Sequence, residues 1–179
     1  MKTFELHTME SAPEETKPLF ENSLKNFGMI PNLHAVLGED PAVLEAYQLL
    51  HKLFQETDFN AAELTVVWQT INVEHECGYC VPAHSLIANM MQVDPAVDTA
   101  LRNKTTLPTE KLQALHETTL SIVQNRGHLT EQELERFYAA GYEPKHILGI
   151  LLGLSQKVMS NYTNHIAKTP LDESFQKFA

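Results

Sequence analysis

Apolar residues recur at intervals of three and four along most of this chain, which is the spacing that predicts amphipathic helices. After Pro41, for example, they fall at Leu44, Tyr47, Leu50 and Phe54. No stretch shows the strict alternation and the turn residues of a β-hairpin. The segments expected to be helical are residues 14–26, 39–55, 60–75, 108–127, 131–140 and 144–167, with a short one beginning at 94.

Residues that favour helix ends flank several of these segments. Asp40 is placed as an N-cap, and Asn60 with Glu63, like Thr130 with Glu133, has the spacing of a capping box. The last segment is apolar almost all round near its middle, so we expect it to lie centrally in the core. The sequence therefore predicts an all-α fold, a single-domain bundle of six or more helices.

Composition and charge narrow the class of protein. The chain has 179 residues, of which 43% are apolar and 20% charged, enough to bury a core as one soluble domain. Its net charge of −10, with scattered basic residues, disfavours nucleic-acid binding. We see neither a secretory signal nor an apolar run long enough to span a membrane, so we expect a cytoplasmic protein with no membrane partner.

The segment EHECGYCVPAHS holds both cysteines of the chain. On one continuous helix, Cys77, Cys80 and His84 would share a face. Pro82, however, fits without loss only in a first helical turn, so the helix should begin near Tyr79 with Cys80 in its first turn. The free N–H groups there favour a thiolate. Cys80 is therefore the candidate nucleophile, and His84, one turn on, is its candidate base.

Other uses of the two cysteines remain open on the residues alone. A structural zinc site needs four ligands, and Cys77, Cys80 and His84 supply three. A c-type haem anchor needs a histidine directly after the second cysteine, where Val81 stands. The pair could also be two inert buried thiols. We expect a redox dithiol with no metal and no cofactor, because a close cysteine pair in the cytoplasm is rarely a structural disulfide.

Two carboxylates are candidates for a proton relay to His84. Glu74 and Glu63 share one face of the helix that leads into the dithiol. In enzymes with an activated nucleophile, a third group such as a carboxylate often orients the base that activates it. Glu74 is the first choice, and Glu63, which also completes a capping box, is the second. Further along the chain, Asn161 and His165 stand four apart and could line a pocket.

The sequence CGYCVPAH, after the helix AELTVVWQTINVEHE, resembles the C-x-x-C-x-x-x-H signature of AhpD-like alkylhydroperoxidases of the carboxymuconolactone decarboxylase superfamily. The match is clearest over residues 40–100, and GILLGLSQKVMSNYTNHIAKTPLDESF resembles the closing segment of a peroxidase-related branch. The resemblance implies one AhpD-like domain over residues 1–179, with an N-terminal extension to about residue 38 and the dithiol motif at 74–85. It also implies a homo-oligomer, either a trimer or a hexamer.

The resemblance also implies roles for the residues of the motif. The second cysteine, Cys80, would attack, the first, Cys77, would resolve, and His84 would be the histidine of the signature. Two positions depart from the better-known members. Their relay glutamate lies twelve residues before the first cysteine, where this chain has Thr65, so one of the two candidate glutamates would have to substitute. Some members also carry a histidine where this chain has Tyr79.

The expected function is thiol-dependent reduction of small alkyl hydroperoxides, an antioxidant activity. Cys80 would attack the peroxide with His84 as general base, and Cys77 would close an internal disulfide that an external dithiol or disulfide reductase reopens. One alternative is a decarboxylase of a lactone acid, which would want a cationic clamp that no arginine next to the motif provides. Another is a redox-switched binding or assembly protein without turnover.

Overall fold

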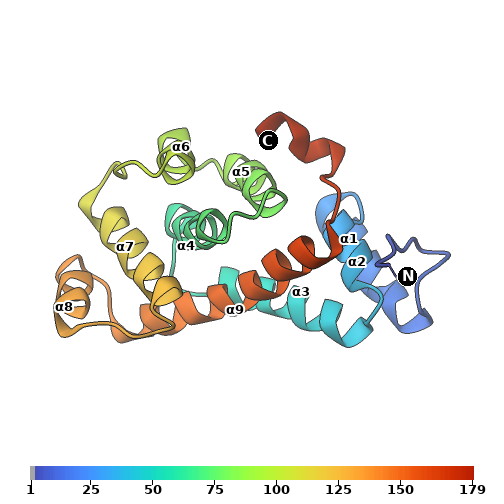
Figure 1. Cartoon of the computed structure of the whole chain (residues 1–179), viewed down its shortest axis with the longest axis horizontal. Helices are drawn as coiled ribbons and strands as arrows, with labels where there is room; N and C mark the ends of the chain where they lie inside the picture. The colour runs from blue at the N-terminus through green and yellow to red at the C-terminus, as the bar shows by residue number, and fades with distance from the viewer. Residues whose placement is uncertain (1–2) are drawn as a thin grey trace.

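The computed structural model describes residues 3–179, which form nine α-helices and two short 3-10 helices, with no β-strand among them (Figure 1). The predicted all-α fold is confirmed. The α-helices are α1 (Lys17–Phe27), α2 (Asn32–Leu37), α3 (Pro41–Gln55), α4 (Ala61–Glu74), α5 (Cys80–Met90), α6 (Pro95–Asn103), α7 (Glu110–Gln124), α8 (Glu131–Ala139) and α9 (Pro144–Ala167). The 3-10 helices are η1 (Glu14–Thr16) and η2 (Glu173–Phe178).

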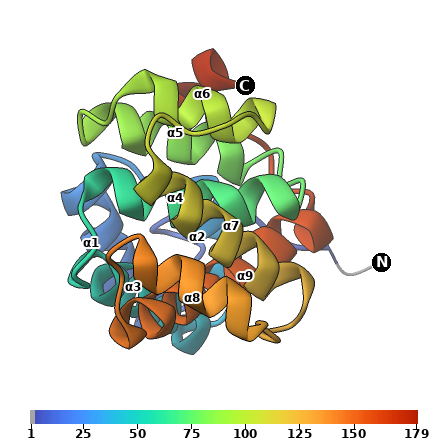
Figure 2. The ribbon, with the colours of Figure 1, turned by 90° about the vertical axis from the view of Figure 1, so that its left-hand side faces the viewer.

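Helix α4 is the most enclosed element of the bundle. Helices α5, α6, α7 and α9 pack around it, as Figures 1 and 2 show from two directions. Trp68 and Ile71 of α4 are fully buried. The expectation that the last helix would be central is wrong in one respect. Helix α9 crosses the molecule beneath α4 but leaves Leu148 and Ile166 67% and 69% exposed, because no described element covers that side of the helix.

Two glycines allow α9 to lie close to the aromatic side chains around the end of α3. A Cβ atom on Gly149 would come within 2.9 Å of the Phe59 ring, and one on Gly153 within 2.9 Å of the Phe54 ring. Both distances are shorter than a carbon–carbon contact. The close approach fixes the position of α9 against α3, and with it the polar face that α9 presents to α5.

The predicted helix starts are mostly confirmed. Asp40 caps α3, and the capping boxes at the starts of α4 and α8 both form. The short helix α2 was not predicted, because its six residues are too few to show a repeat. The chain reaches α2 through a turn that begins at Gly28, whose φ of 72° ends α1 in the left-handed region.

The C-terminal segment folds back over the start of α5 (Figure 1). Its last element, η2, packs against α5, and the residues leading to it contact α2. No periodicity in the sequence predicted this return, because a 3-10 helix of six residues carries no clear apolar pattern. The fold therefore places a segment from the end of the chain beside the dithiol.

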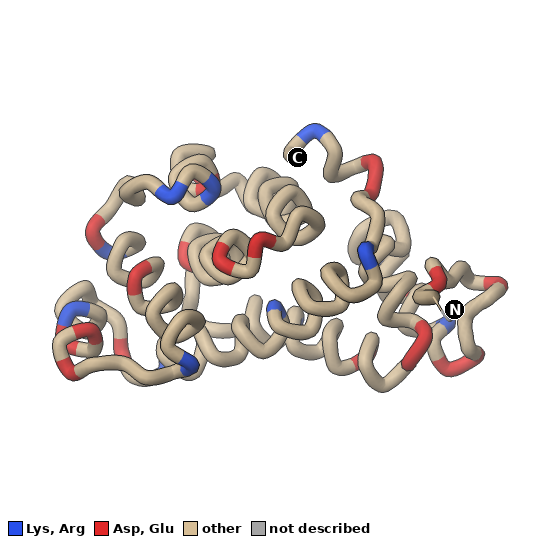
Figure 3. Tube along the Cα trace, viewed as in Figure 1, with Lys and Arg blue, Asp and Glu red and all other residues tan. Residues whose placement is uncertain are grey.

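Lys and Arg residues are scattered along the trace of residues 3–179 and form no continuous basic stripe (Figure 3). Within the same residues, no helix is both long enough and apolar enough to span a bilayer. The described residues therefore present no clustered Lys and Arg surface of the kind that phosphate binding uses.

Candidate active site

The two cysteines lie where α4 ends and α5 begins. After α4 the chain turns through Glu76, whose φ is 53°, and the Cys77 N–H donates to the carbonyl of Asn72 at 3.0 Å. Tyr79 is the N-cap of α5, and Cys80 is its first residue, as Pro82 predicted. Both thiols are free, and the two residues are only 1% and 2% exposed. The Cys80 N–H donates to the Cys77 sulfur at 3.3 Å, which orients one thiol toward the other.

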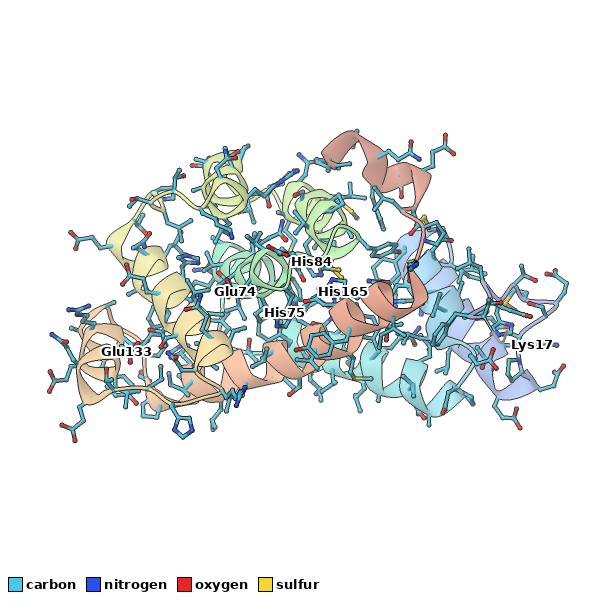
Figure 4. The ribbon with its side chains drawn as sticks, in the orientation of Figure 1. Lys17, Glu74, His75, His84, Glu133 and His165 are labelled. Atoms are coloured by element: carbon cyan, nitrogen blue, oxygen red, sulfur yellow. The ribbon has the colours of Figure 1, made fainter. Side chains whose placement is uncertain are left out.

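A polar face of α9 lies against the dithiol. The Asn164 side-chain amide donates to the Cys80 sulfur at 3.2 Å. About two turns earlier on the same helix, the Lys157 ammonium lies 2.7 Å from Nε2 of His84. Two side-chain contacts therefore join α9 to the first two turns of α5, and the two helices cross, since α5 is seen end-on in Figure 1 where α9 lies across the view. Figure 4 shows His84 between the two helices.

Lys157 donates to His84, which is neutral. Lys157 is fully buried and His84 is 5% exposed. Burial, together with the positive charge of Lys157 and the neighbouring His51, holds the pKa of His84 well below its usual value. Neutral His84 therefore accepts the Lys157 hydrogen bond through Nε2 and carries its proton on Nδ1, which is buried and has no partner in the described residues. No hydrogen bond joins His84 to either cysteine in residues 3–179.

The surroundings of the two thiols separate their acidities. Burial opposes ionisation of Cys80, but hydrogen bonding from the Cys77 thiol, the charge of Lys157 and the polar groups of Ser160 and Asn161 together lower its pKa to about 5. The same hydrogen bond to Cys80, then burial and the negative charge of its neighbour, raise the pKa of Cys77 well above the usual thiol value. At neutral pH the pair therefore holds a thiolate at Cys80 and a thiol at Cys77.

Aromatic rings hold His84 in place. The Trp68 ring packs on His84 with centroids 4.8 Å apart, and His51 stacks on Trp68 at 5.3 Å. Gln156 of α9 connects Trp68 with His51: the Trp68 indole donates to its oxygen at 2.7 Å, and its amide donates to His51 at 2.9 Å. The side chain of His84 is therefore fixed by α4 on one side and by Lys157 on the other.

The residue between the cysteines anchors the motif to the C-terminal segment. The Tyr79 hydroxyl donates to a carboxylate oxygen of Asp172 and accepts from the Leu33 N–H at 3.2 Å. The Phe175 ring of η2 meets the Tyr79 ring edge-on, with centroids 5.8 Å apart. Tyr79 thus holds a structural position here, where the resemblance noted a histidine in some members.

The two candidate glutamates lie outside this constellation. Glu63 is 4% exposed at the other end of α4, where it accepts from Lys111 at 2.8 Å and from the Tyr142 hydroxyl at 3.1 Å. Burial raises the pKa of Glu63, but hydrogen bonds from Lys111, the Asn60 N–H and Tyr142 lower it by more, so the net pKa lies below its usual value. Glu74 accepts from the Gln124 amide at 3.0 Å, between α4 and α7 (Figure 4). Neither carboxylate contacts a cysteine or His84.

Substitution of Glu63 by glutamine is therefore expected to affect stability and not chemistry. It removes a buried ion pair with Lys111 and weakens the capping box, which should lower the free energy of unfolding by about 1–3 kcal/mol in a urea titration. Glu74→Gln, at a half-buried position with one hydrogen bond, is the matched control and should change it by less than about 0.5 kcal/mol. A large fall in catalytic rate for Glu63→Gln with unchanged stability would restore a relay role.

Of the α9 side chains at the site, the sequence predicted Asn161 but not the two that contact His84 and Cys80. Asn161 is buried at the site, where its amide donates to Asn72 at 3.0 Å and its oxygen pairs with His75 at 2.9 Å. His165, its expected companion, is exposed. Lys157 and Asn164 were not predicted. The signal available was a lone lysine in an otherwise apolar helical stretch, with polar residues following at spacings of three and four.

The relay position of the family offers no acid or base here. Thr65 donates its hydroxyl to the carbonyl of Ala61 at 2.9 Å, within its own helix. In residues 3–179 no group of three or more His, Cys, Asp or Glu side chains is arranged to hold a metal ion. The ionisable groups that the structure brings together at the dithiol are the two thiols, His84 and Lys157.

No protein-family model matches the sequence, and no curated protein matches it. Solved structures do match the fold. A peroxidase-related protein from Ralstonia eutropha JMP134, described as an alkylhydroperoxidase AhpD core, aligns with a TM-score of 0.84 and 17% identity over 96% of this chain and 93% of its own. A peroxidase-related protein from Silicibacter sp. TM1040 gives 0.82 and 16%, over 98% and 94%. The chain has the AhpD-like fold.

The AhpD-like fold also includes an enzyme with another named activity. The debrominase Bmp8, in a cysteine-to-alanine variant bound to 2,3,4-tribromopyrrole, aligns with a TM-score of 0.83 and 16% identity, over 99% of this chain and 96% of its own. The fold implied by the resemblance is thus confirmed. Because identities this low establish the fold alone, the choice of reaction depends on the residues of the site.

Proposed function

We propose that this protein is a thiol-dependent peroxidase that reduces small organic hydroperoxides at Cys80. The observation that carries the proposal is the environment of the Cys80 sulfur, which is buried, hydrogen-bonded by Asn164 and lowered in pKa to about 5. A thiolate in such a site is the reactive form of cysteine. The thiol of Cys77, held beside Cys80, is the second thiol that a disulfide needs.

The first step transfers oxygen to sulfur. The Cys80 thiolate attacks the terminal oxygen of the hydroperoxide, the O–O bond breaks, and Cys80 becomes a sulfenic acid as an alkoxide leaves. The alkoxide takes up one proton and departs as an alcohol. Neutral His84 accepts a hydrogen bond from Lys157 and makes none with either cysteine within the described residues.

The second step protects Cys80 from further oxidation. Cys77 displaces hydroxide from the sulfenic sulfur, water is released, and an internal disulfide forms. The Cys80 N–H hydrogen bond to the Cys77 sulfur already holds the two residues together. An external dithiol or disulfide reductase then returns both thiols to the reduced state by thiol–disulfide exchange, so the reaction consumes one hydroperoxide and two thiols per cycle.

The experiment follows loss of cumene hydroperoxide with dithiothreitol in excess at neutral pH. We expect native protein to turn over many times per chain and to produce cumyl alcohol in equal amount. A rate no greater than that of dithiothreitol alone, with fully reduced and folded protein, would reject the peroxidase proposal.

Reductive debromination is the second candidate, and the fold match to Bmp8 favours it over other thiol chemistry. In that reaction a bromoarene and two thiols would give the debrominated arene, a disulfide and hydrogen bromide, so the same Cys77 and Cys80 electrons would be used. Bromide release from 2,3,4-tribromopyrrole, measured under the same conditions, separates the two activities. Bromide release without hydroperoxide loss would favour debromination over hydroperoxide reduction as the function of the site.

We also propose the homo-oligomer that the family resemblance implies. Leu148, Leu151, Tyr162 and Ile166 of α9 are 40–69% exposed and fall on one side of the helix. A contiguous patch of exposed apolar side chains marks an interaction surface more often than single exposed apolar side chains do. Light scattering during size exclusion is expected to find more than one chain per particle, and a monomer would contradict this.

A further inference from the structure

A lysine with no exposed surface needs a partner that stabilises its charge. Lys157 is fully buried, and none of the ion pairs in residues 3–179 joins it to a carboxylate. Its one hydrogen bond goes to neutral His84. Burial lowers the pKa of Lys157, and the groups that raise it again are the thiols of Cys80 and Cys77. Buried charges are otherwise too costly to leave unpaired.

We propose that Lys157 is the acid–base residue of the reaction, serving as the counter-ion of the Cys80 thiolate and as the proton donor to the departing alkoxide. This inference rests on the proposed reduction of hydroperoxides at Cys80. It assigns to a lysine on α9 the acid–base role for which the sequence offered His84, with Glu74 or Glu63 as its relay. Its geometric basis is the pair of contacts from one helix face, Asn164 to Cys80 and Lys157 to His84.

The proton balance of the cycle closes with this pair. In the first step the Cys80 thiolate becomes the sulfenic acid, and the Lys157 ammonium gives one proton to the alkoxide and becomes a neutral amine. The reaction of Cys77 with the sulfenic acid then releases water and changes no net charge. When an external dithiol reopens the disulfide, the new Cys80 thiol returns its proton to the Lys157 amine. The ammonium and thiolate are thereby restored.

His84 has a positioning role in this scheme. Its Nε2 accepts one Lys157 hydrogen, and Trp68 holds its ring from the other side. The ammonium is therefore directed by His84 from α5 while its other hydrogens remain free for the reacting oxygen. The arrangement needs His84 to stay neutral, which its burial ensures.

The buried histidines and tyrosines around the site do not titrate near neutral pH. Burial is the main cause for each of them: it lowers the pKa of His51 to about 4 and that of His84 well below its usual value, and it raises the pKa of Tyr47 and Tyr79 well above theirs. A titration between about pH 4 and 9 thus reports chiefly the Cys80 thiol, with Cys77 above this range.

The test is the ultraviolet absorbance of the thiolate as a function of pH in fully reduced protein, with Cys80→Ser subtracted as background. We expect Lys157→Met and Lys157→Gln to move the midpoint upward by more than about one unit, which lowers the ratio of thiolate to thiol at a given pH by more than about tenfold. Glutamine keeps a donor for His84, so agreement between the two variants assigns the shift to the lost charge. Lys145→Met, at an exposed lysine of the same helix, is the matched control and should leave the midpoint unchanged.

Hydroperoxide kinetics of the same variants complete the test. Both Lys157 variants should show a lower kcat that recovers only in part at alkaline pH, since a thiolate returns there but the proton donor does not. An unchanged midpoint in folded Lys157→Met and Lys157→Gln would overturn the inference whatever the native protein reduces. A shifted midpoint in protein that reduces no hydroperoxide would instead reject the proposed function and, with it, proton donation by Lys157, while the ion pair with Cys80 would stand.

Discussion

Replacing Cys80 with serine is expected to lower hydroperoxide reduction by more than about a thousandfold, to the level of dithiothreitol alone. A serine hydroxyl does not ionise in this range, so the attacking anion is lost while the shape of the buried site is kept. The measurement is the rate of cumene hydroperoxide loss at neutral pH. Circular dichroism of the variant should match that of native protein, since the change replaces one small side chain by another.

Cys77→Ser is the matched variant, because it removes the other thiol of the same motif. It keeps the Cys80 thiolate, so without added reductant it should consume about one equivalent of hydroperoxide and then stop as a sulfenic acid, which a dimedone adduct at Cys80 would reveal. Full activity of Cys80→Ser would contradict the dithiol mechanism. It would favour the decarboxylase alternative, whose chemistry does not need the cysteines.

Replacing Trp68 with alanine is expected to cause the largest loss of stability, about 3–5 kcal/mol in urea unfolding. Trp68 has no exposed surface and packs against Phe54, His51 and His84 with centroid distances of 5.0, 5.3 and 4.8 Å. The change leaves a cavity and strands the side-chain oxygen of Gln156 without its indole donor.

The same substitution should also affect the chemistry, because it removes the wall that holds His84 against Lys157. We expect a lower kcat in the fraction that remains folded. Leu49→Ala, at a 51% exposed position on α3, is the control and should change stability by less than about 0.5 kcal/mol. Loss of less than about 1 kcal/mol for Trp68→Ala would show that the site is far looser than the structure indicates.

The sequence predicted the helices because their signals are local. Asp40, Asn60 and Thr130 cap helices through hydrogen bonds to residues two or three positions away, and such spacings are visible in one dimension. Helix α2 and the return of the C-terminal segment were not visible, because they are short and depend on distant contacts. The hydrogen bond of Tyr79 to Asp172 joins residues 93 positions apart.

In the candidate site, too, the residues with local signals were predicted and those that depend on distant packing were not. The positions of Cys77 and Cys80 at the start of α5 followed from their spacing and from Pro82. Lys157 could not be assigned from sequence, since a lysine in a helical pattern is usually solvent-exposed and only the packing of α9 on α5 shows that this one is buried. The glutamates illustrate the converse: Glu63 had the right type and helix face but points to Lys111 and Tyr142.

The measurement that tests the central claim most directly is a thiol count after addition of one equivalent of cumene hydroperoxide to reduced protein without reductant. The dithiol account predicts that two thiols per chain disappear, one equivalent of alcohol forms, and mass analysis finds a disulfide between Cys77 and Cys80. Survival of both thiols in the presence of the hydroperoxide would contradict it.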